Sequence, residues 1–384
     1  MILSIGKELR AQGHEVKIYC SEFNPKHLKD LHNGLDIEVV PPPAPLKSVL
    51  GASGLTSKIF ERVRRARLYT EAARRITARL PEGFDFVLCE NDYTYKAGAF
   101  YKKSNPRAKI IWIMNNPPFY HSRKNNFLVN TASLATAFWE ARTAKKYAPL
   151  IDWAIVYDKK NKADAEALGY TVKLIGNPLD FDYFYAPVKT IRTGEPIRLF
   201  AVGALSPQRR FEDVITATAI LRNDGIDARA LIICNDYWAD KKYREDFLAH
   251  IKNSGAEKYI DVRLGGVKEE VMLHALRESH VSVVPNSAKV WIATACEAMA
   301  AGLPLVLTRT TSLADVLIDG ENALFFDPKR PEQIAEKIKL LVWHPETYAR
   351  IAAAGQRYVK ENLNFSEFVR EILNPPHRWN ESLT

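Results

Sequence analysis

The chain has 384 residues, of which 47% are hydrophobic and 26% charged, and this composition is typical of a folded globular protein with two domains rather than a disordered one. The net charge of +9 fits an acidic partner such as a nucleotide phosphate or an anionic lipid surface, and by itself it does not indicate a nucleic acid. No apolar run is long enough to span a bilayer, and we expect no signal peptide. The cysteines show no C-x-x-C spacing, so we expect reduced, buried thiols in a cytoplasmic protein: Cys20, Cys89, Cys234 and Cys296.

The chain begins with a predicted helix from Ile2 to Gln12, a Gly13-His14 turn and a strand from Glu15 to Cys20. The next strand is predicted from Ile37 to Val40. The segment from Ser57 to Leu80 is helical by its apolar period, and its other side is strongly basic. Such a helix can lie on the anionic inner face of a membrane, and the alternative is an ordinary solvated helix face. The basic residues are Lys58, Arg62, Arg64, Arg65, Arg67, Arg74, Arg75 and Arg79.

Alternating strands and helices continue through the first half of the chain, which predicts an α/β fold with a parallel sheet. Strands are predicted from Phe84 to Glu90, from Lys109 to Met114 and from Trp153 to Tyr157. Asn115 directly follows the second of these strands, at the edge of the sheet where open α/β folds bind ligands. We interpret Asp180-Phe-Asp182 as structural rather than as a metal site, because it lies in a Tyr/Phe-rich linker.

A second α/β run begins with a strand from Ile197 to Val202, followed by Gly203 and the pair Arg209-Arg210 before a helix. A glycine loop before a helix N-terminus is an anion site through its N–H groups and the helix dipole. Arginine can add bidentate phosphate binding there. The alternative is that both arginines are solvated residues of a first helical turn.

The stretch from Val281 to Leu307 is predicted to form a strand, a polar loop, a helix that ends abruptly, and a second strand. The helix runs from about Ile292 to Ala301 and ends at Gly302, with Pro304 beyond it. The second strand is apolar on both faces, as in parallel sheets. Glu297 stands in an otherwise small and apolar helix.

The run Glu297-Ala-Met-Ala-Ala-Gly302-Leu-Pro304 resembles the signature of the retaining GT-B glycosyltransferases of family 4. The resemblance implies two Rossmann-like domains facing a cleft, and a Glu297 that binds the ribose hydroxyls of a donor nucleotide. A carboxylate suits that role because it can accept two hydrogen bonds from a vicinal diol. The family usually has another glutamate eight positions earlier, against the donor sugar, where this chain has Lys289.

Further motifs extend the resemblance and imply the rest of the donor site. The family has a V-G-R-L-x-x-x-K-G loop whose arginine and lysine hold the diphosphate. In this chain the matching loop begins at Val202-Gly203, with Ala204 at the arginine position and Arg209 at the lysine position. Gly266 lies in a turn like that near the nucleotide base. Thr311 and Ser312 replace two glycines whose amides meet the donor phosphates, and would add hydroxyl donors. Asn115 stands where family members often have a histidine facing the reacting sugar, and could hydrogen-bond a sugar hydroxyl but not act as a base.

The beginning of the chain departs from the family, whose first domain normally opens with a strand and a glycine-rich loop. We therefore expect a first domain without its N-terminal strand, unless another segment fills that place in the sheet. The expected domains are an acceptor-side domain over 1–186, a donor domain over 187–360, and a C-terminal helix over 361–384 that crosses back to the first domain.

The predicted reaction moves a sugar from a nucleoside diphosphate sugar to a hydroxyl of a glycan or lipid-linked acceptor, as in the synthesis of polysaccharide precursors. The anomeric configuration is retained, with no metal, no cofactor beyond the nucleotide-sugar co-substrate, and no nucleic-acid partner. Arg209, aided by Lys289, would stabilise the departing diphosphate. Two alternatives stay open. Lys289, Ala204 and Asn115 depart from the pattern and the first strand is missing, which would suit a paralogue that binds nucleotide sugars without catalysis. Nucleotide-sugar epimerases share the same architecture and are the second alternative.

Overall fold

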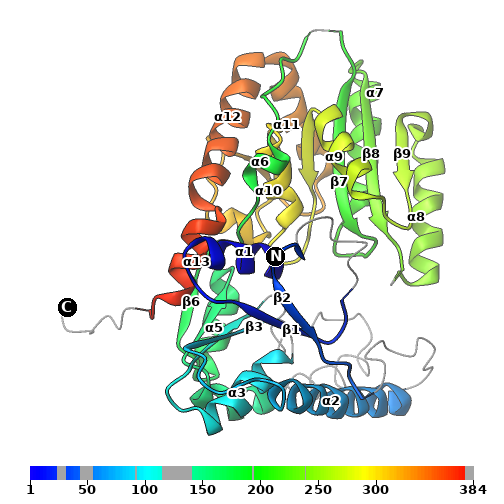
Figure 1. Cartoon of the computed structure of the whole chain (residues 1–384). Coiled ribbons are helices and arrows are strands. Elements are labelled where there is room, and N and C mark those ends of the chain that lie inside the picture. The colour runs from blue at the N-terminus through cyan, green and yellow to red at the C-terminus, as the bar shows by residue number, and fades with distance from the viewer. Residues whose placement is uncertain are drawn as a thin grey trace, which may run out of the picture. The chain divides into compact units, whose positions relative to one another are not determined.

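The computed structural model of this protein describes residues 1–23, 32–43, 55–90, 93–114, 141–192, 194–237 and 239–376, without the side chains of 55–62. These residues form two compact units (Figure 1). Unit 2 comprises Asn177–Asn364, and unit 1 comprises Met1–Gly176 with the described residues from Phe365 onward. Residues 186–196, where the sequence analysis places the start of the second domain, lie inside unit 2. Within these ranges, every helix is too short or too polar to cross a bilayer.

The described residues of unit 2 form one parallel sheet of six strands in the order β12-β11-β10-β7-β8-β9. The strands are β7 (Ile197–Ala204), β8 (Ala228–Asn235), β9 (Ile260–Arg263), β10 (Val281–Val284), β11 (Leu305–Thr308) and β12 (Leu324–Phe326). The helices are α6 (Phe181–Phe184), α7 (Phe211–Asn223), α8 (Lys241–Asn253), α9 (Glu269–Glu278), α10 (Ala293–Ala300), α11 (Pro331–Trp343) and α12 (Pro345–Asn362). Short 3-10 turns cover Glu257–Tyr259 and Ser312–Asp315.

Strands β10 and β11 are buried at every residue. Helices cover both faces of a parallel sheet, so its central strands can be apolar on both sides. This is why the sequence shows continuous β-branched and leucine runs at these positions instead of an alternating pattern. The two-face burial predicted for the strand after Pro304 is confirmed.

Helix α10 ends in the way its sequence predicts. Gly302 has φ +74°, its N–H donates to the Met299 carbonyl, and the N–H of Leu303 donates to the Ala298 carbonyl. This is a Schellman cap, which glycine favours because it has no side chain to strain. A side-chain carbon at Gly302 would also lie 3.0 Å from the Ala186 carbonyl oxygen. The cap therefore sets where β11 starts, and it allows the backbone around Ala186 to pack against Gly302.

The described part of unit 1 contains two separate parallel sheets, β1-β2 and β3-β4-β5-β6. The strands are β1 (Lys17–Cys20), β2 (Asp36–Val39), β3 (Phe86–Glu90), β4 (Lys109–Ile113), β5 (Trp153–Val156) and β6 (Val172–Leu174). The helices are α1 (Ile2–Ala11), α2 (Leu55–Thr77), α3 (Thr94–Ser104), α5 (Lys159–Ala167) and α13 (Phe365–Leu373), with a 3-10 turn at Ala148–Leu150 and helical residues at 141–147. No described strand joins β1 to β3.

The C-terminal helix α13 packs in unit 1. The indole N–H of Trp153 donates to the Ile372 carbonyl at 2.9 Å. Lys173 binds the Glu371 carboxylate at 2.5 Å and its carbonyl at 2.7 Å. The chain thus leaves unit 1 after β6 and returns to it at the end.

Three details of the sequence prediction need correction or comment. The basic helix was predicted over 57–80 but runs over Leu55–Thr77, because 78–80 form a turn. Asp180 caps α6 by accepting the N–H of Tyr183 at 3.2 Å, which gives it the structural role expected for it. The cysteines are free thiols, of which Cys20 alone among the described residues is partly exposed.

Candidate functional site

Unit 2 has a topological switch point between β7 and β10. The chain leaves β7 toward β8 and β9, and then crosses to the other side of β7 to form β10. Open α/β sheets bind ligands at such a point, outside the carboxyl ends of the strands. The two loops that follow β7 and β10 are joined there, since the N–H of Ser287 donates to the Gln208 carbonyl at 2.9 Å.

Arg209 lies against the last residues of β7. Its guanidinium packs on Gly203, where a side-chain carbon would come within 3.0 Å of Arg209 Nε. Arg209 Nη1 also lies 3.5 Å from Asn286 Oδ1, at the limit of a hydrogen bond. The predicted pair Gly203 and Arg209 is therefore brought together, because only glycine leaves room for the guanidinium on that backbone.

Asn286 connects the loops that follow β10 and β11. It is 2% exposed, and its carbonyl accepts the hydroxyls of Thr308 at 2.5 Å and Thr310 at 2.6 Å. With its amide oxygen turned toward Arg209, it links three loops at the carboxyl edge of the sheet. Asn286 was not predicted as a site residue, although its position one residue after Pro285, at a strand end, is a usable signal.

Lys289 is held by an ion pair. Its Nζ lies 2.6 Å from Asp315 Oδ1 and 3.4 Å from the Thr311 carbonyl. The second oxygen, Asp315 Oδ2, is buried and has no hydrogen-bond partner among the described residues. The predicted cation is therefore present near the turn after β11, but its charge is partly balanced by Asp315.

The hydroxyls of Thr311 and Ser312 differ in availability. Thr311 is fully buried and its Oγ1 donates to the Thr308 carbonyl at 3.1 Å, so its proton is engaged inside the turn. Ser312 is 1% exposed, and its Oγ has no partner among the described residues. A buried hydroxyl without a partner is costly, and a bound group with an acceptor oxygen would satisfy it. Ser312 is thus the better candidate of the two for contacting a phosphate.

Glu297 lies in the middle of α10, on a partly buried position. Burial, together with repulsion from the Glu269 carboxylate at the start of α9, raises its pKa to about 7. No hydrogen bond or ion pair engages the Glu297 carboxylate within the described residues. The side chain is therefore a partly desolvated acceptor with free lone pairs, as binding of a ribose diol would require.

The loops after β8 and β9 form the next part of this edge. The N–H of Gly266 donates to the Cys234 carbonyl at 3.0 Å, and the N–H of Gly265 donates to Asp236 Oδ1 at 2.9 Å. Partial desolvation opposes the charge of Asp236, but its bonds to Arg244 and Gly265 hold the pKa of this carboxyl below its usual value. Gly266 is placed as predicted from the sequence at a strand-to-loop turn, whereas Asp236 was not foreseen.

Arg210 has a role different from that of Arg209. It adopts the left-handed conformation at φ 53°, directly before α7, and pairs with Asp213 through Nε at 3.1 Å and Nη2 at 2.5 Å. Burial raises the pKa of Asp213, and the Arg210 hydrogen bonds offset part of this effect. Arg210 is therefore a fixed structural cation of the loop.

Asn115, the predicted contact to the donor sugar, lies outside the described residues. In the part of the chain that the structure describes, no three His, Cys, Asp or Glu side chains converge in a way that could hold a metal ion.

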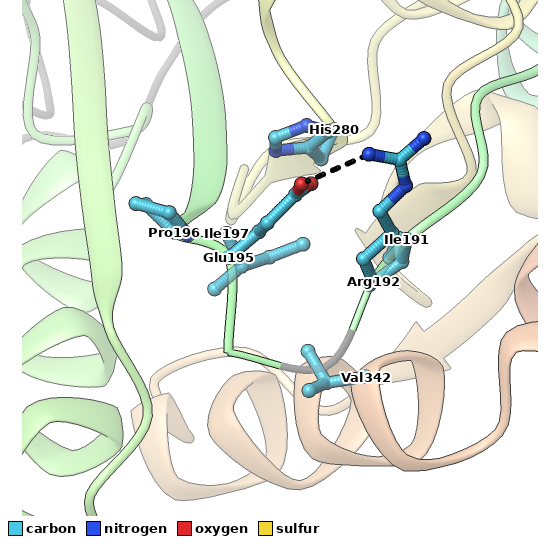
Figure 2. Close-up of a pocket in the computed structure, with 7 residues that line it drawn as sticks. All are labelled: Ile191, Arg192, Glu195, Pro196, Ile197, His280 and Val342. Atoms are coloured by element: carbon cyan, nitrogen blue, oxygen red, sulfur yellow. Dashed lines mark ion pairs between the residues drawn. The ribbon is translucent and has the colours of Figure 1, made fainter.

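A small cavity lies at the opposite, amino edge of the sheet, beside the first residue of β7 (Figure 2). Arg192 and Glu195 form an ion pair of 3.6 Å at its wall. His280 accepts the N–H of Arg198 at Nδ1, and burial and the cations Lys189 and Arg198 lower its pKa to about 4. His280 is neutral and hydrogen-bonded, and Arg192 is paired with Glu195, so we interpret this cavity as part of the packing and not as a ligand site. Its lining residues are Ile191, Arg192, Glu195, Pro196, Ile197, His280 and Val342.

Comparison with known proteins gives a family match to residues 186–358, described as glycosyl transferases group 1. A curated relative is the GDP-mannose-dependent α-(1-6)-phosphatidylinositol dimannoside mannosyltransferase of Mycobacterium tuberculosis, 26% identical over 161 residues, which are 42% of this chain and 39% of that protein. An uncharacterized glycosyltransferase of Methanocaldococcus jannaschii is 29% identical over 86 residues, 22% of this chain and 24% of its own length. The chain thus spans well under half the length of these curated relatives.

Solved structures match over nearly the whole chain. Anabaena HepE in complex with UDP and glucose has a TM-score of 0.70 at 15% identity, covering 97% of this chain and 94% of that one. Sucrose-phosphate synthase from Thermosynechococcus elongatus has a TM-score of 0.70 at 16% identity, covering 96% and 90%. At these identities the likeness establishes the fold, and the prediction of two Rossmann-like parallel-sheet domains of the GT-B kind is confirmed.

Proposed function

Because residues 186–358 match the family of glycosyl transferases group 1, we propose that the chain belongs to this family and transfers a sugar from a nucleoside diphosphate sugar to a hydroxyl acceptor. The bond between the anomeric carbon and the diphosphate oxygen breaks, and the diphosphate leaves with the electron pair. The acceptor oxygen forms the new bond to that carbon, and its proton passes to the departing diphosphate oxygen. The anomeric configuration is retained, and no metal takes part.

The observation that carries this proposal is the arrangement at the switch point of unit 2. Arg209, packed on Gly203, and Lys289, beside the turn after β11, supply two positive groups at the carboxyl edge of one sheet. Glu297 supplies a desolvated carboxylate on the helix that follows β10. These are the groups that a nucleoside diphosphate needs: cations for the phosphates and an acceptor for the ribose hydroxyls.

Catalysis follows from the charge that grows on the leaving diphosphate. Arg209 and Lys289 stabilise this charge, and the Ser312 hydroxyl and the N-terminus of α10 add donors on the same edge. Fixed donors need not reorient during the reaction, so their stabilisation favours the transition state over the ground state. Asn115 remains a proposed contact to the donor sugar.

We further propose a glycan or lipid-linked acceptor, reached at the inner face of a membrane by a cytoplasmic protein. The mycobacterial relative is named for a phosphatidylinositol dimannoside, which supports a lipid-linked acceptor. Helix α2 exposes Arg64, Arg67, Arg74 and Arg75, with Glu71 as the nearby acidic side chain, 3.7 Å from Arg74 and 3.8 Å from Arg75. An excess of exposed arginines on one helix favours an anionic surface.

The test is a panel of UDP-, GDP-, ADP-, CDP- and dTDP-sugars, incubated with lipid extract as acceptor, with release of the nucleoside diphosphate as the readout. We expect turnover with one donor class, and loss of that turnover and of nucleotide binding in Glu297→Ala. Binding of a nucleotide sugar without release of the diphosphate or transfer of the sugar would favour the non-catalytic paralogue. The Lys289–Asp315 ion pair supports this alternative, because it engages the ammonium group that would otherwise face the diphosphate. An isomerised sugar without acceptor would indicate an epimerase. Absence of binding to every donor would overturn the proposal.

A further inference from the structure

Tyr237 is an aromatic side chain at the carboxyl edge of the unit 2 sheet that the core does not cover. It follows β8 by two residues and is 69% exposed. Its backbone N–H donates to Asn235 Oδ1 at 3.1 Å, which fixes the turn that carries the ring. An anchored ring at a ligand-binding edge has its apolar area free for a ligand.

Asp236 ties this turn to the loop after β9. One of its carboxylate oxygens accepts the N–H of Gly265 at 2.9 Å, and the other accepts Arg244 Nε at 2.8 Å. The N–H of Gly266 donates to the Cys234 carbonyl. Two hydrogen bonds therefore hold 265–266 beside the turn of Tyr237.

Gly265 and Gly266 leave uncovered the side of the backbone on which a side chain would stand. Their φ angles are +77° and +75°, and a side-chain carbon built on either would meet no atom of the described residues within 4 Å. Positive φ explains the choice of glycine, and the absence of neighbours means that a planar group could approach these peptides closely.

The same edge continues into the proposed donor site on both sides. Toward the ribose, α9 begins three residues after Gly266, and its Glu269 acts electrostatically on Glu297. Toward the phosphates, the N–H of Leu205 donates to the Asn235 carbonyl at 2.7 Å and joins the turn to the loop that carries Arg209. In a nucleotide the ribose separates base from diphosphate, so a ribose at Glu297 directs the base toward 235–237 and 265–266.

We propose that Tyr237 stacks on the base of the bound nucleotide, with the uncovered Gly265–Gly266 backbone leaving room for that base. This inference rests on the proposed function, since the site must hold a nucleotide. Every base has a π face, so the ring contributes affinity for the nucleoside part of either a purine or a pyrimidine nucleotide.

The test compares wild type, Tyr237→Ala, Tyr237→Leu and Tyr237→Phe by calorimetric titration with UDP, GDP and inorganic diphosphate, which lacks a base. We expect the Kd of the preferred nucleotide to rise roughly tenfold in the Ala variant and severalfold in the Leu variant, the loss of one stacking contact. The Phe variant and the binding of inorganic diphosphate should be unchanged. The matched control is Trp343→Ala, which removes a ring that is 63% exposed at the end of α11, next to the cavity at the amino edge.

The outcomes separate this inference from the proposed function. Nucleotide binding that survives in Tyr237→Ala but is lost in Glu297→Ala would overturn the stacking proposal and leave the donor site standing. An equal loss for inorganic diphosphate would show that Tyr237 acts by shaping the loop, and would also overturn it. Failure of wild type to bind any nucleoside diphosphate would instead contradict the proposed function.

Discussion

The Glu269 carboxylate, in the first turn of α9, repels the Glu297 carboxylate of α10, and this repulsion adds to burial in raising the pKa of Glu297 to about 7. Glu297 thus changes charge near neutral pH. The ionised form accepts two hydrogen bonds, whereas the protonated form loses part of that capacity. The proton on this one side chain therefore controls the ribose contact.

We expect nucleotide affinity to increase severalfold as the pH rises from about 6 to about 8. Glu269→Gln removes the repulsion, lowers the pKa of Glu297 and should move the midpoint of this profile to lower pH. Glu270→Gln, one residue along the same helical turn, is the matched control and should leave the midpoint in place. Calorimetric titrations across the pH range provide the measurement, and a flat profile in wild type would contradict the assignment.

The same pKa shift has a consequence for stability. A folded-state pKa above the ordinary value means that the contribution of Glu297 to stability is fully present below about pH 4.5 and is lost as the pH rises through about 7. Glu297→Gln should therefore raise the free energy of unfolding by about 1–2 kcal/mol at pH 8, after allowance for partial solvent screening, and by little at pH 5. Urea unfolding at both pH values measures this. Equal effects at the two pH values would show that the carboxylate is not destabilising when charged.

Lys289 contributes its charge from within an ion pair with Asp315. We expect Lys289→Gln to raise the Kd for a nucleoside diphosphate roughly fivefold or more, because one charge-assisted contact is lost. Asp315→Asn keeps the shape but frees the lysine, so it should preserve or tighten diphosphate binding. The double variant should bind as Lys289→Gln does. If Lys289→Gln binds normally, the lysine serves only to hold the turn after β11.

The sequence predicts the parts of this protein that depend on neighbouring residues. The two-face apolar run at Leu305–Thr308 and the glycine stop at Gly302 are visible in the sequence because burial pattern and backbone conformation are local properties. The family motif likewise leads to Glu297 and Arg209. Helix ends are less well determined, as at Thr77, where no strong stop residue precedes the turn.

The sequence does not predict contacts between side chains that are distant along the chain. Lys289 and Asp315 are in different loops, and their pairing depends on the order of β10 and β11 in the sheet. The bond from Gly265 to Asp236 depends in the same way on β8 and β9 lying side by side. Tyr237 was not identified because a surface aromatic has no local signature of function.

Arg210 offers a test of backbone strain at the entrance to α7. A left-handed conformation costs a non-glycine residue about 1 kcal/mol, and here the Asp213 ion pair compensates for it. Arg210→Ala loses the pair and keeps the strain, so we expect it to destabilise unit 2 by about 2 kcal/mol. Arg210→Gly loses the pair but relieves the strain, and should be about 1 kcal/mol more stable than the Ala variant. Equal stability of the two variants would show that the loop changes conformation when the ion pair is absent.

Gly203 tests whether the position of Arg209 matters for nucleotide binding. A side-chain carbon at Gly203 would stand 3.0 Å from Arg209 Nε and 3.1 Å from its Cζ, so Gly203→Ala should push the guanidinium off the end of β7. We expect the Kd for a nucleoside diphosphate to rise roughly tenfold, close to the effect of Arg209→Ala, with the Gly203→Ala/Arg209→Ala double variant no worse than either.

Gly265→Ala is the matched control for Gly203→Ala, because its added carbon meets no atom within 4 Å in the described part of the chain, although the backbone is also at positive φ. It should share the backbone strain but leave diphosphate binding intact, which inorganic diphosphate titrations can establish without involving the base. Additive losses in the double variant would mean that Gly203 and Arg209 act independently, and the guanidinium would then not be the group that Gly203 positions.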